Sequence, residues 1–157
     1  MKLKFLLISI LLILTSRVYS ADSDVHIGID LGYGFADIGA DETAQTIANL
    51  SGSTVTYTYD ESTFAGRVYM DYDIGSDLFV EVGYLQSGSL DATYTLSGAS
   101  ATESYVVNGF DLSLGFKDTE SGLFFKGGAH SSEIDGSATI TISGTTYAAN
   151  ANASGIG

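Results

Sequence analysis

Residues 24–37 read DVHIGIDLGYGFAD and alternate between large apolar residues and small or polar ones. The large residues are Val25, Ile27, Ile29, Leu31, Tyr33 and Phe35. A period of two places them on one face of a β-strand. The opposite face is mostly glycine with one carboxylate, Asp30. A strand of a soluble sheet buries its large residues and turns its charges to water. This pattern therefore indicates apolar surroundings on one side and a small, sparsely charged interior on the other.

Four further segments repeat the alternation. They are residues 64–74 (FAGRVYMDYDI), 78–85 (LFVEVGYL), 109–117 (GFDLSLGFK) and 123–130 (LFFKGGAH). Each sets one apolar face against a face of small, charged and aromatic residues, so each is predicted to be a strand.

The connections between these segments are unequal in length. Residues 75–77 and 118–122 form short turns, whereas residues 39–63, 88–105 and 131–152 are long and rich in Ser, Thr, Gly and Ala. Short connections on one side and long ones on the other predict an antiparallel up-and-down meander, and they are typical of transmembrane barrels.

The long connections contain alternating threonine-rich stretches. Residues 53–59 read STVTYTY, and an internal repeat relates ATYTLSG (92–98) to ATITISG (138–144). This alternation predicts hairpins that extend the strands at one end. The alternative is that these stretches are flexible polar loops.

The N-terminus has the form of a secretory signal peptide. Residues 1–20 carry two lysines, an apolar run and small residues before Ala21. The run is short for a membrane-anchor helix, which is the alternative interpretation. We therefore expect residues 1–20 to be a cleaved signal and residues 21–157 to form one domain.

The predicted mature chain is strongly acidic. The whole chain has a formal charge of −13, and removal of the signal leaves three basic residues against nineteen acidic ones. This charge excludes nucleic acid as an expected partner. The absence of cysteine excludes disulfides.

A lipid environment explains the two faces. Only helices and closed barrels satisfy their backbone groups in a bilayer, and a barrel turns apolar residues to lipid and polar ones to its lumen. We therefore expect an all-β transmembrane barrel. Its lumen would hold a structural charge network of Asp30, Arg67, Glu81 and Lys126.

The sequence resembles the small outer-membrane β-barrels of Gram-negative bacteria, of the OmpA and OmpX type. The residues that carry the resemblance are HIGIDLGYGF, DLFVEVGYL, GFDLSLGF and LFFKGG, and it extends over residues 24–157. It implies an eight-stranded barrel in the outer membrane, among lipid and lipopolysaccharide. It also implies delivery by periplasmic chaperones and the barrel-assembly machinery, and surface loops that contact host or phage ligands. Glu81 in FVEVGY takes the place of the family's inward carboxylate.

The chain departs from the family at its C-terminus. About five and a half strands are present, since residues 153–157 resemble the start of a sixth. Family members end in a strand that finishes on an aromatic residue, whereas this chain ends at Gly157. We therefore expect a fragment that lacks the last strands of the barrel.

No catalytic, cofactor or metal site is predicted. Of the two histidines, His26 begins a strand near the periplasmic rim and His130 is expected near the outer rim, so they cannot share a site. Around the first long connection lie several acidic residues, for which a solvated loop is favoured over diffuse calcium or magnesium bridging to lipopolysaccharide. They are Asp37, Asp41, Glu42, Asp60 and Glu61.

The sequence thus favours an outer-membrane barrel with a structural or cell-surface interaction role, such as adhesion, and no enzymatic activity. Two alternatives remain. One is a secreted, soluble all-β adhesin whose apolar faces meet in a sandwich. The other is a small-solute channel, although an eight-stranded barrel has room for little more than its own side chains.

Overall fold

The computed structural model describes residues 16–18, 24–118 and 120–157, and in them the chain is all-β with one helix. The strands form a single antiparallel sheet. The elements are β1 (Ser16–Val18), β2 (Val25–Phe35), α1 (Ala40–Ser51), β3 (Thr56–Tyr59), β4 (Ser62–Asp73), β5 (Leu78–Ser87), β6 (Leu90–Leu96), β7 (Ala99–Lys117), β8 (Phe124–Ile142) and β9 (Thr145–Ile156).

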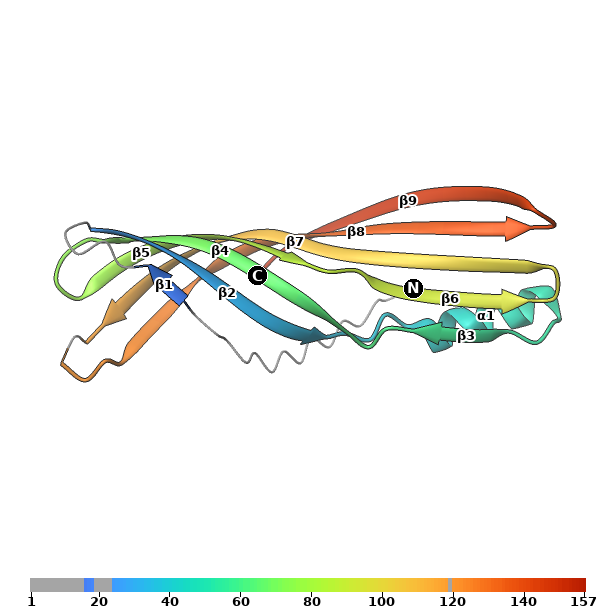
Figure 1. Cartoon of the computed structure of the whole chain (residues 1–157), viewed down its shortest axis with the longest axis horizontal. Helices are drawn as coiled ribbons and strands as arrows, with labels where there is room; N and C mark the ends of the chain where they lie inside the picture. Colours follow the sequence, from blue (N-terminus) through green and yellow to red (C-terminus); the bar gives the residue numbers. More distant parts are fainter. Residues whose placement is uncertain (1–15, 19–23, 119) are drawn as a thin grey trace.

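The sheet has two halves that share its two longest strands, β7 and β8, of 19 residues each (Figure 1). In the proximal half, β2, β4, β5, β7 and β8 pair in that order. In the distal half, β3, β6, β7, β8 and β9 pair in that order. The same two strands therefore run from one end of the elongated molecule to the other.

The strands predicted from alternation are confirmed. The five segments correspond to β2, β4, β5, the second part of β7 and the first part of β8. The hairpin extension is also confirmed, because β6 pairs with the start of β7, and β8 continues to pair with β9. Residues 153–156 form the end of β9, and the backbone of Gly157 hydrogen-bonds with the backbone of His130.

The long connection at residues 39–63 contains a helix that was not predicted, α1. Gly39 and Gly52 flank this helix in left-handed conformations, and the Gly52 N–H donates to the carbonyl of Ala48. Glycine commonly follows the last helical residue in this way. Asp41 and Glu42 lie in the first turn, where negative charge is favourable.

The sheet is open. Strands β2 and β8 share no register pairs in the part of the chain that the structure describes. Most of the predicted signal peptide lies outside the described residues. Its segment β1 pairs with residues 27–29 on the outer edge of β2, so cleavage after Ser20 would expose that edge.

The two faces of the proximal half are inverted relative to a soluble sheet. The large apolar residues are exposed, and on β2 and β4 their exposed fractions run from 38% for Tyr33 to 74% for Phe64. The opposite face, here called the inner face, buries Tyr69, Asp71 and Glu81 to 6% or less. The face that carries the charged side chains is thus the buried one.

The distal half has a small hydrophobic core of its own. Helix α1 lies against β3 and β6 (Figure 1), and its Ala40 and Ala44 pack with Leu90, Ala92 and Tyr94. Tyr94 is fully buried. In the described residues, no helix is both long and apolar enough to cross a membrane.

Candidate functional site

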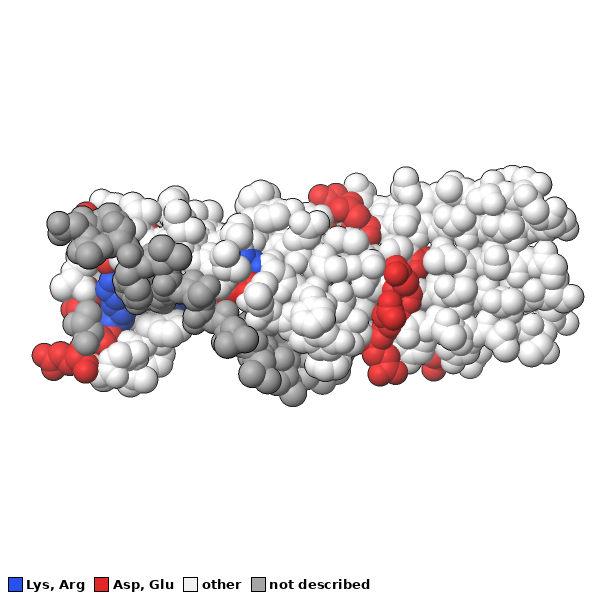
Figure 2. Space-filling view, in the orientation of Figure 1, with Lys and Arg blue, Asp and Glu red and all other residues white. Residues whose placement is uncertain are grey.

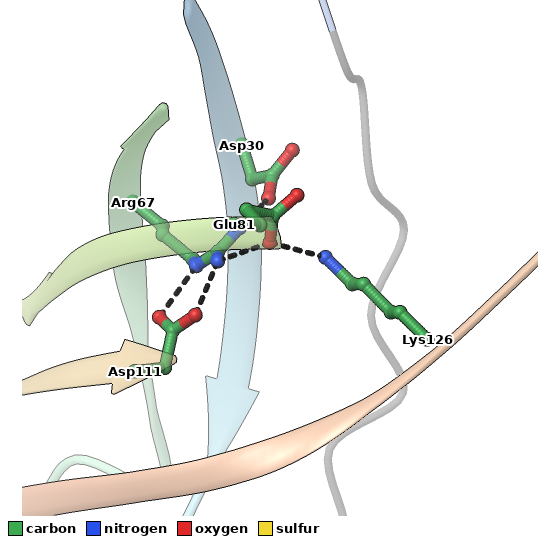
Figure 3. A network of polar contacts seen from close by, with 5 residues as sticks. All are labelled: Asp30, Arg67, Glu81, Asp111 and Lys126. Carbon is green, nitrogen blue, oxygen red and sulfur yellow. Dashed lines mark hydrogen bonds and ion pairs between the residues drawn. The ribbon is translucent and has the colours of Figure 1, made fainter. Parts of the chain in front are cut away.

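An ion-pair network centred on Arg67 occupies the inner face of the proximal half (Figure 3). The Arg67 guanidinium on β4 donates to Asp30 on β2 at 3.0 Å, to Glu81 on β5 at 2.5 Å and to both carboxylate oxygens of Asp111 on β7 at 2.8 and 2.5 Å. The Asp111 contact is the bidentate geometry that arginine favours. One side chain therefore ties four strands together.

Lys126 enters the network from β8. Its ammonium donates to Oε1 of Glu81 at 2.7 Å, across the intervening strand β7. Ser113 and Gly115 are the β7 residues between them in the register, and both are small. The Glu81 side chain is only 2% exposed and forms ion pairs with two cations, Arg67 and Lys126.

Gly83 makes the contact between Arg67 and Asp111 geometrically feasible. It lies on β5, between Tyr69 of β4 and Asp111 of β7 in the register. A Cβ at this position would collide with the guanidinium and with the Asp111 carboxylate. The ion pair therefore lies directly over a residue without a side chain.

Two aromatic rings also lie on this face. The Tyr69 ring lies beneath both cations, with the Arg67 Cζ 4.9 Å and the Lys126 Nζ 5.8 Å from its centre. It covers Gly28 on the neighbouring strand, as Phe79 covers Gly115. The inner face is thus closely packed with charged and aromatic groups.

The structure brings together all four residues of the predicted network, Asp30, Arg67, Glu81 and Lys126. It adds Asp111, which the sequence analysis placed on the correct face but left out of the network. The available signal was its alternation with Phe110 and Leu112. That this face lines the lumen of a barrel stays a prediction.

A second polar cluster lies beside the network on the same face, because Asp71 of β4 is the register partner of Glu81 of β5. His26 Nδ1 is 2.7 Å from Oδ1 of Asp71, its register partner on β4. Two residues along β4, Oδ2 of Asp73 accepts a hydrogen bond from the Lys117 ammonium at 2.5 Å. This arrangement places His26, Asp71 and Asp73 side by side.

The two histidines lie on strands that are separated by β4, β5 and β7. His130 does not end its strand, because β8 continues to Ile142, and it pairs with Asp111 of the network strand β7. Its expected place near the outer rim stays a prediction. The two rings therefore belong to different parts of the sheet.

Two acidic residues of the first long connection accept hydrogen bonds from tyrosines. The Tyr57 hydroxyl donates to Asp41 at 2.8 Å, and the Tyr59 hydroxyl donates to Glu61 at 3.2 Å. These hydrogen bonds raise the pKa of both phenols.

Figure 2 shows acidic side chains in a band across the middle of the molecule, whereas its distal end is uncharged.

No family model, no curated protein and no solved structure matches this chain.

Proposed function

We propose that this protein is an outer-membrane β-barrel whose distal half acts at the cell surface. The observation that carries the proposal is the inversion of the proximal half, with exposed apolar side chains on one face and buried ion pairs on the other. A large apolar surface of this kind marks contact with a membrane or with another protein. Lipid suits this apolar surface because acyl chains would cover the whole face at once.

Strand lengths support the proposal. Strands β2, β4 and β5 have 11, 12 and 10 residues, and a tilted transmembrane β-strand needs about 9–11. The apolar face ends in an aromatic cluster, in which the Tyr33 ring is 4.8 Å from Phe64 and 5.5 Å from Phe35. Aromatic girdles at the interface are typical of membrane barrels.

Closure of the barrel requires partners for the edges of β2 and β8. Unpaired backbone groups cost several kcal/mol each in hydrocarbon. The eight-stranded architecture that the resemblance implies would supply these partners. The same resemblance implies assembly by periplasmic chaperones and the barrel-assembly machinery, within lipid and lipopolysaccharide.

The two alternative functions have less support. A soluble adhesin sandwich would cover the apolar face with a second sheet, and the described residues lay no second layer over it. A channel would need an open interior, whereas the ion pairs and the Tyr69 ring fill the inner face.

The membrane placement can be tested with single tryptophans, because the chain contains none. Leu112→Trp and Thr102→Trp place the probe on the same strand, ten residues apart and on the same face. In vesicles of brominated lipid, we expect strong quenching of the Leu112→Trp fluorescence, because this side chain would contact acyl chains. Thr102→Trp, in the distal half, should instead respond to aqueous acrylamide.

Equal quenching of the two probes by acrylamide, with no effect of brominated lipid, would contradict the membrane assignment and favour the soluble adhesin. The same samples should also run differently on a gel with and without boiling. Closed barrels resist detergent because every backbone group is paired internally.

The surface role can be tested by shortening the β8–β9 hairpin. Ser143 and Gly144 both have positive φ, as a two-residue type I′ turn requires. Deleting residues 139–142 and 145–148 removes four residues from each strand, so the turn and the alternation of faces are kept. We expect unchanged heat-modifiability and loss of bacterial adherence to cultured epithelial cells. Full adherence by the shortened protein would remove the support for a role of this hairpin.

A further inference from the structure

We propose that His26, Asp71 and Asp73 form a binding site for a divalent transition-metal ion. Each offers one ligand atom, and the three atoms lie within 4.8 Å of one another. The site follows from strand pairing and does not depend on the membrane assignment. Its ligands come from two strands, which explains why no metal-ligand spacing is visible in the sequence.

The backbone register creates the triad. Asp71 and Asp73 are two residues apart on β4, so they project from the same face, and His26 on β2 is the register partner of Asp71. A zinc ion holds its nitrogen and oxygen ligands at about 2.0–2.2 Å. An ion between the three groups would replace the present contact of His26 with Asp71.

The charges of the inner face favour a further cation. Among the side chains that the structure describes, its carboxylates outnumber the permanently charged groups that reach them, Arg67, Lys117 and Lys126. The carboxylates are those of Asp30, Asp71, Asp73, Glu81 and Asp111. Asp71 is 3% exposed, and a buried carboxylate is costly unless it is paired or bound to a metal.

Asp73 is already oriented for such a role. Its Oδ2 accepts from Lys117, whereas its Oδ1 is buried and has no hydrogen-bond partner. The lysine would act as the outer partner that holds a ligating carboxylate in place, as is common around metal ions. The unpartnered oxygen is the atom left to bind the ion.

The donor set selects the class of metal. Imidazole suits zinc, copper, iron and nickel, whereas calcium and magnesium prefer oxygen ligands alone. One histidine and two carboxylates therefore point to a transition ion such as Zn²⁺, with a fourth position left for water. The diffuse bridging of calcium or magnesium considered for the acidic loops has different chemistry.

The experiment is a titration of the purified protein with Zn²⁺ by isothermal calorimetry at neutral pH, alongside Mg²⁺ and Ca²⁺. We expect one Zn²⁺ per chain and no comparable binding of the other two ions. His26→Gln and Asp73→Asn should each weaken Zn²⁺ binding at least tenfold. The matched controls are His130→Gln and Asp118→Asn, which alter the other histidine and a turn carboxylate and should leave the affinity unchanged.

X-ray absorption of the Zn²⁺-loaded wild-type protein keeps the proposal testable if a variant fails to fold. One imidazole nitrogen among oxygen neighbours is the expected coordination. Zn²⁺ binding that is equally strong in His26→Gln, or an all-oxygen shell in the wild-type protein, would overturn the site. So would an absence of Zn²⁺ binding to the folded wild-type chain.

Discussion

Replacement of Arg67 by alanine is expected to lower the free energy of unfolding by about 3–5 kcal/mol, because breaking a buried ion pair leaves its partner charges uncompensated. Arg67 is 12% exposed and contacts Asp30, Glu81 and Asp111 at once. Its removal leaves three carboxylates on one face, and the cation that still contacts one of them among the described side chains is Lys126. Equilibrium unfolding in urea measures the change.

Two controls separate this effect from a general sensitivity to charge. Lys117 lies on the same face and, among the described residues, forms its ion pair with Asp73. Lys117→Ala should therefore lower the free energy of unfolding less than Arg67→Ala does. Arg67→Lys keeps the charge but loses the bidentate contact with Asp111, so its cost should be intermediate. A loss below about 1 kcal/mol for Arg67→Ala, the level of an exposed pair, would show that the network adds little to stability.

A double-mutant cycle tests the coupling of Glu81 with Lys126. Glu81 is 2% exposed and Lys126 is 37% exposed, so Glu81→Ala should be the more destabilising of the two. Because both changes remove the same contact, the double variant should cost less than the sum of the single ones. Strict additivity would mean that the two groups do not interact.

Replacement of Tyr94 by alanine is expected to destabilise the distal half by roughly 3–5 kcal/mol, the range for loss of a large aromatic side chain from a core. Tyr94 is fully buried among Leu90, Ala92 and the two alanines of α1. Hydrogen exchange should accelerate in α1 and β3 and remain slow in the proximal half, because the core cluster contains no proximal residue. Equal acceleration in both halves would show that they unfold as one unit.

Tyr94→Phe is the matched control, since it keeps the ring. Burial raises the pKa of Tyr94 to about 12, and the negative charge of Glu103 adds to the shift. The folded protein therefore holds the phenolic proton more tightly than the unfolded chain does. This stabilisation is complete below about pH 10 and is lost as the pH rises towards 12. Tyr94→Phe should reduce the alkaline loss of stability in the distal half.

The strand pattern could be predicted because alternation depends on neighbouring residues alone. The apolar residues of β2 repeat every second position whether they face lipid or a core, so the strand and its faces follow directly. The ends of β7 and β8 were harder to place, since Thr, Ser and Ala alternate there with few large side chains. Their assignment as hairpins rested on the alternation of threonines.

Helix α1 was missed because its composition resembles a polar loop. Residues 40–51 include only Ile47 and Leu50 as large apolar side chains, and the buried residues are two alanines. The signals that were available are acidic residues in the first turn and Gly52 just after the last helical residue. They were outweighed by the small, polar composition of the connection.

The site could be predicted only in part, because contacts across the sheet depend on register. The network members share a face that alternation reveals. The contact between Arg67 and Asp111 passes over β5, and it requires Gly83 opposite Asp111. The proximity of His26 to Asp71 likewise depends on how β2 aligns with β4.

The continuity of β7 and β8 through both halves has a mechanical consequence. At roughly 3.3 Å per residue, strands of 19 residues span about 60 Å. A pull on the distal tip travels along them and loads the ladder between β5 and β7 in shear, so that its hydrogen bonds bear the force together. The ion pairs from Arg67 to Asp111 and from Lys126 to Glu81 cross these strands and oppose the same sliding. Tension applied at the tip is thus resisted collectively, whereas peeling from an edge would break one bond at a time.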